Sequence, residues 1–391
     1  MTQRKDQIQS RRLAELPPYL FVEIDRIRKD YARRGGRVLD LGIGDPDLGA
    51  PPELLERLRA ALECRDYDRY PQDRGLPRLV DAVAGWAQRE HGVPLGRDEI
   101  LITIGSKEAI AHLPLAVVDP GDVVLVPDPG YPVYNSSAIF AGASPRRMPL
   151  LASNGFWPDL RSVDREAGGR IRLIYLNYPN NPTAAVAGAG RFREAVEFSG
   201  ELGSVLVNDA AYSEIVYDGK SSPLFPIARE AGIPYVEFFS FSKTFSITGW
   251  RAGFAVGSPD VVAALARTKA NIDSGVFSAV QAAIADILEG DYRAITDRIV
   301  SVYRERRDIL GKGLKEAGFE CAPPGGTFYF WLPVPGGAGS IDFCAKLLES
   351  TGIVSAPGIG FGSRGEGYFR LSLTASTDTI REAGEKLARF M

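Results

Sequence analysis

The sequence predicts an α/β protein in which a large domain with a mostly parallel sheet is joined to a smaller α+β domain. Three observations support this fold class. Short runs rich in β-branched residues alternate with helical patterns through the middle of the chain. These runs are almost wholly apolar, as expected of parallel strands that helices cover on both faces. Near residue 285 the pattern changes to longer amphipathic stretches with fewer strands.

The expected elements follow each other in a regular order. The strands of the large domain are expected at residues 99–106, 122–128, 171–177, 204–209, 235–240 and 251–257, with a helix at 107–118. Amphipathic stretches at 258–270 and 278–317 lead to a second region, with strands expected at 326–334 and 367–374 and helices at 341–350 and 377–391. Because chain ends often lie close together, we predict a large domain of residues 46–285 and a small domain formed by residues 1–45 and 286–391.

The composition excludes several classes of function. Of the 391 residues, 45% are hydrophobic and 24% are charged, which is typical of a globular protein. The net charge of −3, without a basic tract, argues against nucleic acid and anionic membranes as partners. Two histidines and three scattered cysteines argue against a metal site, a Ser-His-Asp hydrolase and a disulfide framework. The polar N-terminal segment and the lack of a membrane-spanning run predict a soluble, cytoplasmic protein.

Five polar motifs stand where expected strands end. They are GSK at 105–107, DPGYP at 128–132, NYPNNP at 177–182, NDAAY at 208–212 and SFSK at 240–243. In open α/β sheets, ligands bind outside the carboxyl ends of the strands. We therefore expect the five motifs to share one site.

The first of these motifs is suited to binding an anion. Ser106 and Lys107 follow a strand and open a helix, where backbone N–H groups and the helix dipole favour negative charge. Helix capping alone also explains a Gly-Ser pair. Ser240, Ser242 and Arg251 would complete a phosphate cage, because a guanidinium forks onto phosphate oxygens. The sequence has no P-loop pattern, so a nucleotide bound in that way is not indicated.

Asp209 and its neighbours are suited to binding a flat, protonated ring. A carboxylate after an apolar strand is expected to be buried and to need a partner, which is either a structural ion pair, a helix cap or a ring nitrogen. Tyr212 offers a phenol nearby, and Tyr131 either stacks on the ring or packs in its turn. Asn181 lies in a loop where Tyr178-Pro179 and Asn181-Pro182 are candidate cis bonds.

Lys243 connects these parts. A lysine, a phosphate cage, an aspartate, two tyrosines and an asparagine are what pyridoxal 5'-phosphate requires of a protein. The Lys243 amine would bond to the cofactor's aldehyde, and Asp209 would keep the ring nitrogen protonated so that the ring accepts electrons.

The order of these motifs resembles that of class I/II pyridoxal-phosphate aminotransferases of fold type I. SFSKTFSITGWRAGFAVG is similar to the family's lysine motif, and GSKEAIAHL, PDPGYPVY, NYPNNPT and NDAAYSEI are similar to its other blocks. The resemblance runs from LGIGDPD at 41–47 to YFRLSLT at 368–374 and implies a mostly parallel, seven-stranded sheet in the large domain. LPPYLFVEIDRIR, KANIDSGVFSAVQ and GEGYFRLSLT resemble the LL-diaminopimelate aminotransferase branch.

The resemblance also implies roles for single residues. Lys243 would hold the cofactor and move the proton, Asp209 would pair with the ring nitrogen, Tyr212 and Asn181 would contact the ring hydroxyl, and Tyr131 would stack on the ring. Ser106, Lys107, Ser240, Ser242 and Arg251 would hold the phosphate. Arg370 would bind the substrate α-carboxylate beside the backbone of Gly44, together with Asn181. Tyr70 would reach the phosphate of a neighbouring subunit, which implies a homodimer with shared active sites.

One position departs from the family pattern. Ala184 stands in NNPTA where the family usually has glycine. A positive φ there is unfavourable for alanine, so we expect a slightly altered loop without loss of a catalytic atom.

The implied reaction moves an amino group between an L-amino acid and a 2-oxo acid by a ping-pong mechanism. For the LL-diaminopimelate branch the pair is LL-2,6-diaminopimelate and 2-oxoglutarate, in lysine biosynthesis. The alternatives are a general alanine-, aspartate- or aromatic-type aminotransferase, a carbon–sulfur β-lyase on the same cofactor, and a non-catalytic cofactor-binding regulator.

Overall fold

The computed structural model describes residues 8–16, 20–165, 168–219 and 221–390. Its largest sheet has seven strands. Their spatial order is β2 (Ile100–Thr103), β8 (Gly253–Gly257), β7 (Tyr235–Ser240), β6 (Val205–Asp209), β5 (Ile171–Leu176), β3 (Val123–Asp128) and β4 (Ser144–Pro149). Only β8 runs antiparallel to its neighbours. The predicted mostly parallel sheet is therefore confirmed.

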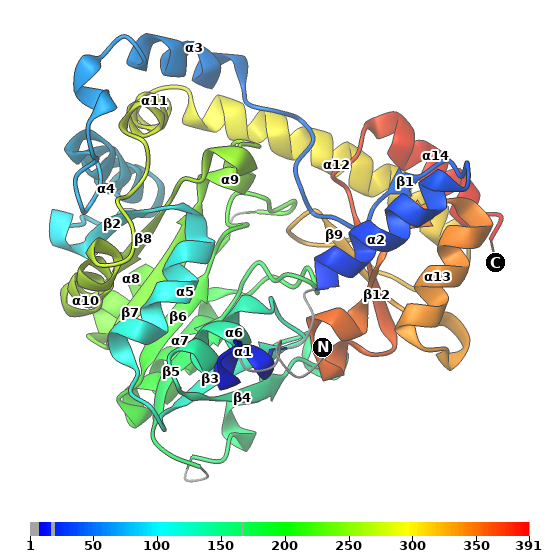
Figure 1. Ribbon diagram of the computed structural model, residues 1–391, viewed down its shortest axis with the longest axis horizontal. Helices are drawn as coiled ribbons and strands as arrows, with labels where there is room; N and C mark the ends of the chain where they lie inside the picture. Colours follow the sequence, from blue (N-terminus) through cyan, green and yellow to red (C-terminus); the bar gives the residue numbers. More distant parts are fainter. Residues whose placement is uncertain (1–7, 17–19, 166–167, 220, 391) are drawn as a thin grey trace.

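Helices cover both faces of this sheet, which explains the apolar strands (Figure 1). One face packs on α5 (Gly105–Val117), α6 (Val133–Phe140) and α10 (Pro259–Ala270). The other packs on α4 (Pro77–His91), α7 (Ala189–Leu202), α8 (Phe225–Ala231) and α11 (Ser278–Glu289). Every residue of β3, β6, β7 and β8 is buried, because neither face of these strands reaches solvent.

The strand β4 was not predicted from the sequence. This strand, SPRRMP, lies at the edge of the sheet, pairs only with β3 and leaves five of its six residues at least partly exposed. Because one side of the strand faces solvent, it needs no apolar run, and its prolines are tolerated at an edge. The expected strand at 99–106 was also too long, since Gly105 already begins α5.

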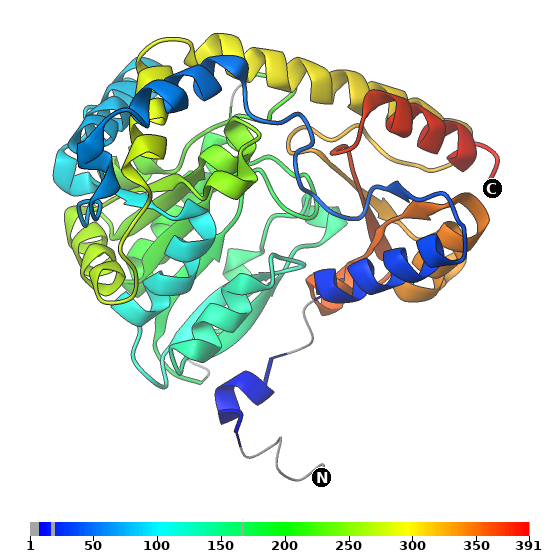
Figure 2. The same cartoon turned by 45° about the horizontal axis from the view of Figure 1, so that its top comes forward.

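Two smaller sheets lie at the other end of the molecule. β9 (Tyr329–Pro333), β12 (Tyr368–Ser372) and β11 (Ala356–Pro357) form an antiparallel sheet, and β1 (Leu39–Asp40) pairs in parallel with β10 (Ile353–Val354). α2 (Leu20–Arg33), α13 (Ser340–Thr351) and α14 (Thr377–Leu387) surround them (Figures 1 and 2). The β1–β10 pair joins segments from both ends of the chain. We propose domain boundaries near residues 45 and 285, which this distribution of strands supports.

A long helix connects the two regions. α12 (Tyr292–Glu316) runs from the large sheet to α14 (Figure 2). The expected amphipathic stretch 278–317 is interrupted at Gly290, so α11 and α12 are separate helices. The remaining α-helices are α1 (Arg11–Ala14), α3 (Pro52–Ala61) and α9 (Phe241–Thr244). Within the described ranges, no helix combines the length and the apolar character needed to cross a bilayer.

Candidate active site

The five sequence motifs do meet at one cavity. A cavity of about 310 Å³ lies where β3, β5, β6 and β7 end and the small sheets begin. Twelve of the thirteen residues that the sequence analysis singled out for the cofactor or the substrate line it: Gly44, Ser106, Lys107, Tyr131, Asn181, Asp209, Tyr212, Ser240, Ser242, Lys243, Arg251 and Arg370. The structure therefore brings the five motifs together at the carboxyl ends of the strands.

Tyr70 is the exception, because it does not line the cavity. Its side chain is 88% exposed, so it has almost no contact with its own chain. A role for Tyr70 at a phosphate therefore requires another copy of the protein.

Lys243 lies on α9, directly after the end of β7. Its side chain is largely buried, and Nζ donates a hydrogen bond to the backbone oxygen of Gly44 at 3.2 Å. Burial lowers the pKa of Lys243 to about 8, with a further lowering by Arg251 and Arg370 and an opposing effect of Asp45. Roughly a tenth of this amine is therefore neutral at pH 7, far more than of an ordinary lysine, and a nucleophile or a base requires the neutral form.

The start of α5 and Arg251 form an anion-binding corner. Gly105 has φ +71°, and a Cβ at this position would approach a guanidinium nitrogen of Arg251 to 3.0 Å. The absence of a side chain thus lets Arg251 lie against the turn that opens α5. Ser242 adds a buried hydroxyl that has no hydrogen-bond partner within the described part of the chain. Backbone N–H groups, hydroxyls and a guanidinium at one corner suit a phosphate.

Asp209 provides a buried carboxylate in the lining of the cavity. Its side chain is 5% exposed and accepts hydrogen bonds from the Tyr134 hydroxyl at 2.7 Å and the Ala211 backbone N–H at 3.3 Å. Burial raises the pKa of Asp209 to about 6, although both hydrogen bonds lower it. A carboxylate in this environment gains by pairing with a cationic group, such as a protonated ring nitrogen.

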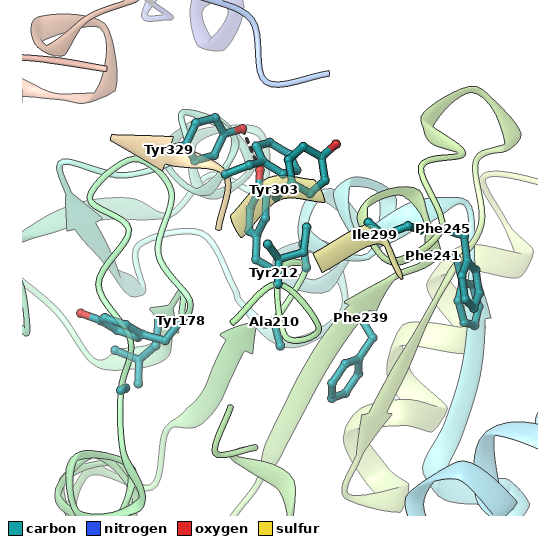
Figure 3. Packing of buried hydrophobic residues seen from close by; sticks show 14 of the residues in the cluster. Tyr178, Ala210, Tyr212, Phe239, Phe241, Phe245, Ile299, Tyr303 and Tyr329 are labelled. Atoms are coloured by element: carbon teal, nitrogen blue, oxygen red, sulfur yellow. Dashed lines mark hydrogen bonds between the residues drawn. The ribbon is translucent and has the colours of Figure 1, made fainter. Parts of the chain in front are cut away.

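Tyr212 joins the large sheet to the small one. Its hydroxyl lies 3.0 Å from that of Tyr329 on β9 (Figure 3). Gly44 packs against Tyr329, since a Cβ at Gly44 would overlap the Tyr329 hydroxyl. Burial raises the pKa of Tyr212, and its closeness to Tyr329 adds to this effect. Tyr212 is therefore a neutral phenol that can donate to a ligand in the cavity.

Arg370 is fully enclosed beside this pair. It donates to Asn181 Oδ1 at 2.8 Å and to the backbone oxygen of Gly42 at 3.0 Å. Its guanidinium carbon lies 4.0 Å from the ring centroid of Tyr329 and 4.7 Å from that of Phe361. Stacking and hydrogen bonds fix the guanidinium plane, which prepares it for a planar carboxylate.

The Asn181 loop has the backbone geometry that the sequence suggested. Tyr178-Pro179 and Asn181-Pro182 are cis, as is Asp128-Pro129. Ala184 adopts φ +59°, so this position does require the left-handed conformation that glycine tolerates better. Asn177 Oδ1 accepts from the Asn181 backbone N–H at 2.9 Å, and Asn177 Nδ2 donates to the backbone oxygen of Asp209 at 2.6 Å. Asn177 thus connects the loop that carries Asn181 to the end of β6, where Asp209 lies.

Three further residues of the site were not predicted from the sequence: Tyr134, Asn177 and Tyr329. Tyr134 lies three residues beyond Tyr131, in the same loop-to-helix segment, and Asn177 opens the NYPNNP motif. Their motifs were recognised, but their orientation toward Asp209 depends on how three strands pack. Tyr329 stands in an apolar strand pattern, where nothing local distinguishes it from a core residue.

Comparison with known proteins identifies the family. The family model for aminotransferase class I and II matches residues 36–387. The chain belongs to this family. An LL-diaminopimelate aminotransferase of Moorella thermoacetica is 47% identical over 387 residues, covering 98% of each chain. A substrate-bound structure of BacF from Bacillus subtilis has a TM-score of 0.91 at 34% identity, covering 98% of this chain and 97% of that one. A mutant aspartate aminotransferase of Thermus thermophilus has a TM-score of 0.90 at 29% identity, covering 98% and 99%.

The protein is therefore an aminotransferase with the fold of type I enzymes. Members of this family depend on pyridoxal phosphate, and the cavity of this aminotransferase meets that cofactor's needs at three points. One space is surrounded by an amine with a lowered pKa, a corner whose Ser242 hydroxyl has no partner among the described residues, and a buried carboxylate.

Proposed function

We propose that this aminotransferase binds pyridoxal 5'-phosphate at Lys243. The observation that carries the proposal is the arrangement around that lysine. Its amine lies in a cavity that also contains the Arg251 corner, the buried Asp209 and the enclosed Arg370. Three separate charge requirements of one molecule, for its phosphate, its ring nitrogen and its aldehyde, are matched by three groups of residues.

A different set of residues would bind each part of the cofactor. Ser106, Lys107, Ser240, Ser242 and Arg251 would hold the phosphate, Asp209 would pair with the ring nitrogen, Tyr212 and Asn181 would contact the ring hydroxyl, and Tyr131 would stack on the ring. The cofactor supplies an electron sink for the negative charge that develops at the substrate α-carbon. Burial of Asp209 favours its pairing with a protonated nitrogen, and Tyr134 holds the carboxylate in place.

Arg370 and Lys243 would act on the substrate itself. Arg370 would bind the α-carboxylate next to Asn181 and Gly44, because its guanidinium is already oriented by stacking on Tyr329. With the carboxylate fixed, Nζ of Lys243 would take the proton from the α-carbon as a general base. The lowered pKa of Lys243 matches this task near neutral pH.

For the substrate we propose LL-2,6-diaminopimelate, with 2-oxoglutarate as acceptor, in lysine biosynthesis. The 47% identity to the Moorella thermoacetica enzyme over nearly the whole chain supports this substrate. The three segments that resemble this branch add support, because they lie near both ends of the chain and from the end of α10 to the start of α11. The second candidate is a general alanine-, aspartate- or aromatic-type aminotransferase, which the likeness to an aspartate aminotransferase supports.

We further propose a homodimer with shared active sites. The exposure of Tyr70 supports this dimer. Tyr70 is 88% exposed, whereas the other residues predicted for the cofactor and the substrate line one cavity. In such a dimer Tyr70 would reach the phosphate in the partner's cavity. A cytoplasmic location is proposed from the three free cysteines, since free thiols are usual in reducing compartments.

The test is an amino-transfer assay on a panel of substrates. LL-diaminopimelate, glutamate, aspartate and alanine are offered with 2-oxoglutarate, or with oxaloacetate when glutamate is the donor. We expect LL-diaminopimelate to have the highest kcat/KM among the donors other than glutamate. Good turnover of alanine, with little or no turnover of LL-diaminopimelate, would contradict the proposed substrate. It would still agree with the protein being an aminotransferase. Formation of pyruvate and ammonia from cystathionine would favour the β-lyase, and lack of a spectral change with every amino acid would favour the regulator.

A further inference from the structure

A cluster of charges around the buried Lys269 lies next to the anion-binding corner, outside the cavity; its other members are partly exposed. Glu108 of α5 accepts a bond from Lys269 Nζ at 3.1 Å, and Asp273 accepts one from the same ammonium at 2.5 Å. His112 Nδ1 lies 2.7 Å from the second oxygen of Glu108. None of these residues lines the cavity. The proposed chemistry therefore leaves the cluster without a role.

The cluster does not resemble a surface ion pair or a metal site. Lys269 is 2% exposed, although lysine is rarely buried without a reason. The ligand atoms of Glu108, His112 and Asp273 lie within 4.8 Å of one another, but the ammonium of Lys269 already bonds to both carboxylates. The cluster thus carries its own cation. Removing one member of such a buried set leaves its partners uncompensated, which is strongly unfavourable.

Glu108 connects the cluster to the anion-binding corner. Its Oε2, the oxygen that bonds to Lys269, also accepts a hydrogen bond from the Ile104 backbone N–H at 2.8 Å. Ile104 directly precedes Gly105, whose positive φ allows Arg251 to lie against the turn. The Glu108 carboxylate therefore holds the backbone between the end of β2 and the start of α5. In this way it sets the direction of the first N–H groups of the helix.

Asp273 connects the same cluster to a second segment. Its Oδ1 accepts from Lys269 and also from the Gly275 backbone N–H at 2.8 Å. Gly275 has φ +89°, and a Cβ there would meet Pro71 at 3.2 Å. Pro71 directly follows Tyr70, the residue proposed to reach the partner's phosphate. One ammonium thus holds together the two segments on which phosphate binding is proposed to depend.

We propose that Glu108, Lys269 and Asp273 are positioning residues that set the geometry of the phosphate-binding parts of the site. The proposal rests on the proposed binding of pyridoxal phosphate. It predicts that damage to the cluster weakens binding of the phosphate group selectively. Groups that hold the ring, such as Asp209 and Tyr212, belong to other strands and keep their positions.

The experiment compares two ligands that differ only in the phosphate. Dissociation constants of pyridoxal phosphate and pyridoxal are measured by absorbance for the full-length protein, stripped of cofactor. The variants are Lys269→Met, which removes the shared cation, and Asp273→Asn, which keeps an acceptor for Gly275 and loses the charge. The matched control is Lys312→Met, because Lys312 forms an exposed pair with Glu316 on α12. Urea unfolding checks that each variant is folded.

In Lys269→Met and Asp273→Asn, the dissociation constant of pyridoxal phosphate is expected to rise about tenfold or more. That of pyridoxal should change less than about twofold. Lys312→Met should change neither dissociation constant. Equal weakening of both ligands, or no weakening in Asp273→Asn, would overturn the proposal. A wild-type protein that binds neither ligand would instead refute the proposed function and this inference with it. Asp273→Asn decides the matter if Lys269→Met fails to fold.

Discussion

The hydroxyls of Tyr212 and Tyr329 lie 3.0 Å apart and form a hydrogen bond between the two regions of the molecule. Tyr212 follows β6 of the large sheet, and Tyr329 begins β9 of the small one. The Tyr329 ring also stacks on Arg370, 4.0 Å from its guanidinium carbon. One side chain thus orients a residue proposed for the cofactor and a residue proposed for the substrate.

Tyr329→Phe is expected to impair both roles moderately. The ring remains under Arg370, but Tyr212 loses its partner in a buried environment, which is unfavourable by about 1–3 kcal/mol. We expect the free energy of unfolding of the cofactor-free protein to fall by about that amount and kcat/KM to fall about tenfold. Tyr217→Phe is the matched control, since Tyr217 is buried and its hydroxyl is unbonded in the described part of the chain. Equal losses in both variants would contradict the assigned link.

Arg370→Lys should lower kcat/KM by about 100-fold for amino acid and oxo acid alike. Lysine keeps the charge but cannot bind a carboxylate with two parallel bonds or stack on Tyr329 in the same way. Steady-state kinetics checks this prediction. Arg306→Lys is the control, because Arg306 is also buried and binds Asp47 outside the cavity. A loss confined to Arg370→Lys supports the assignment, whereas unchanged KM values for both substrates would argue against it.

The Lys243 amine should react as a lysine with a pKa of about 8. In the cofactor-free protein, its rate of modification by an amine-directed reagent should rise tenfold per pH unit below 8 and level off above. Ordinary lysines level off only near pH 10.4. Asp45→Asn should move the midpoint lower, because the Asp45 carboxylate favours the ammonium form. Peptide mass spectrometry at a series of pH values measures both midpoints, and an upward shift in Asp45→Asn would be inconsistent with this account.

Asp209→Asn should stabilise the cofactor-free protein at neutral pH while removing activity. A carboxyl whose pKa rises from 3.8 to about 6 on folding holds its proton longer in the folded state. Stability therefore falls as pH rises from about 4 to 6 and stays lower above, by about 2–3 kcal/mol. Asparagine does not titrate, so the free energy of unfolding of Asp209→Asn should not show this fall. Its difference from the wild-type protein should therefore grow as the pH rises from about 4 to 6. Urea unfolding at pH 4.5 and 7.5 tests the difference; an advantage that does not grow with pH would contradict the raised pKa.

The sequence predicted the parts of this fold that depend on local patterns. Apolar runs located the covered strands, because burial on both faces leaves no room for polar residues. β4 was missed since an edge strand containing Arg146 and Arg147 needs no such run. The reversed direction of β8 also has no local signal, as it depends on which neighbours the strand joins.

In the candidate site, too, residues in local motifs were predicted and residues that depend on distant contacts were not. Lys243, Asp209 and Arg370 stand in motifs with a recognisable order. Tyr329 stands in no such motif, and the PDPGYPVY motif that contains Tyr134 gives no signal for its contact. Both roles arise from contacts with distant segments, because Tyr329 meets Tyr212 across 117 positions and Tyr134 meets Asp209 across 75. In the proposed dimer, the contacts of Tyr70 would lie on a second copy of the chain, so the contacts within one chain do not show them.

The most direct test of the central claim is to find the lysine that carries the cofactor. The protein is loaded with pyridoxal phosphate, reduced with borohydride, digested and mapped by mass spectrometry. We predict a single modified peptide with the added mass on Lys243, and no stable modification in Lys243→Ala. The added mass on Lys107 or Lys269, or an equally modified Lys243→Ala variant, would contradict the account.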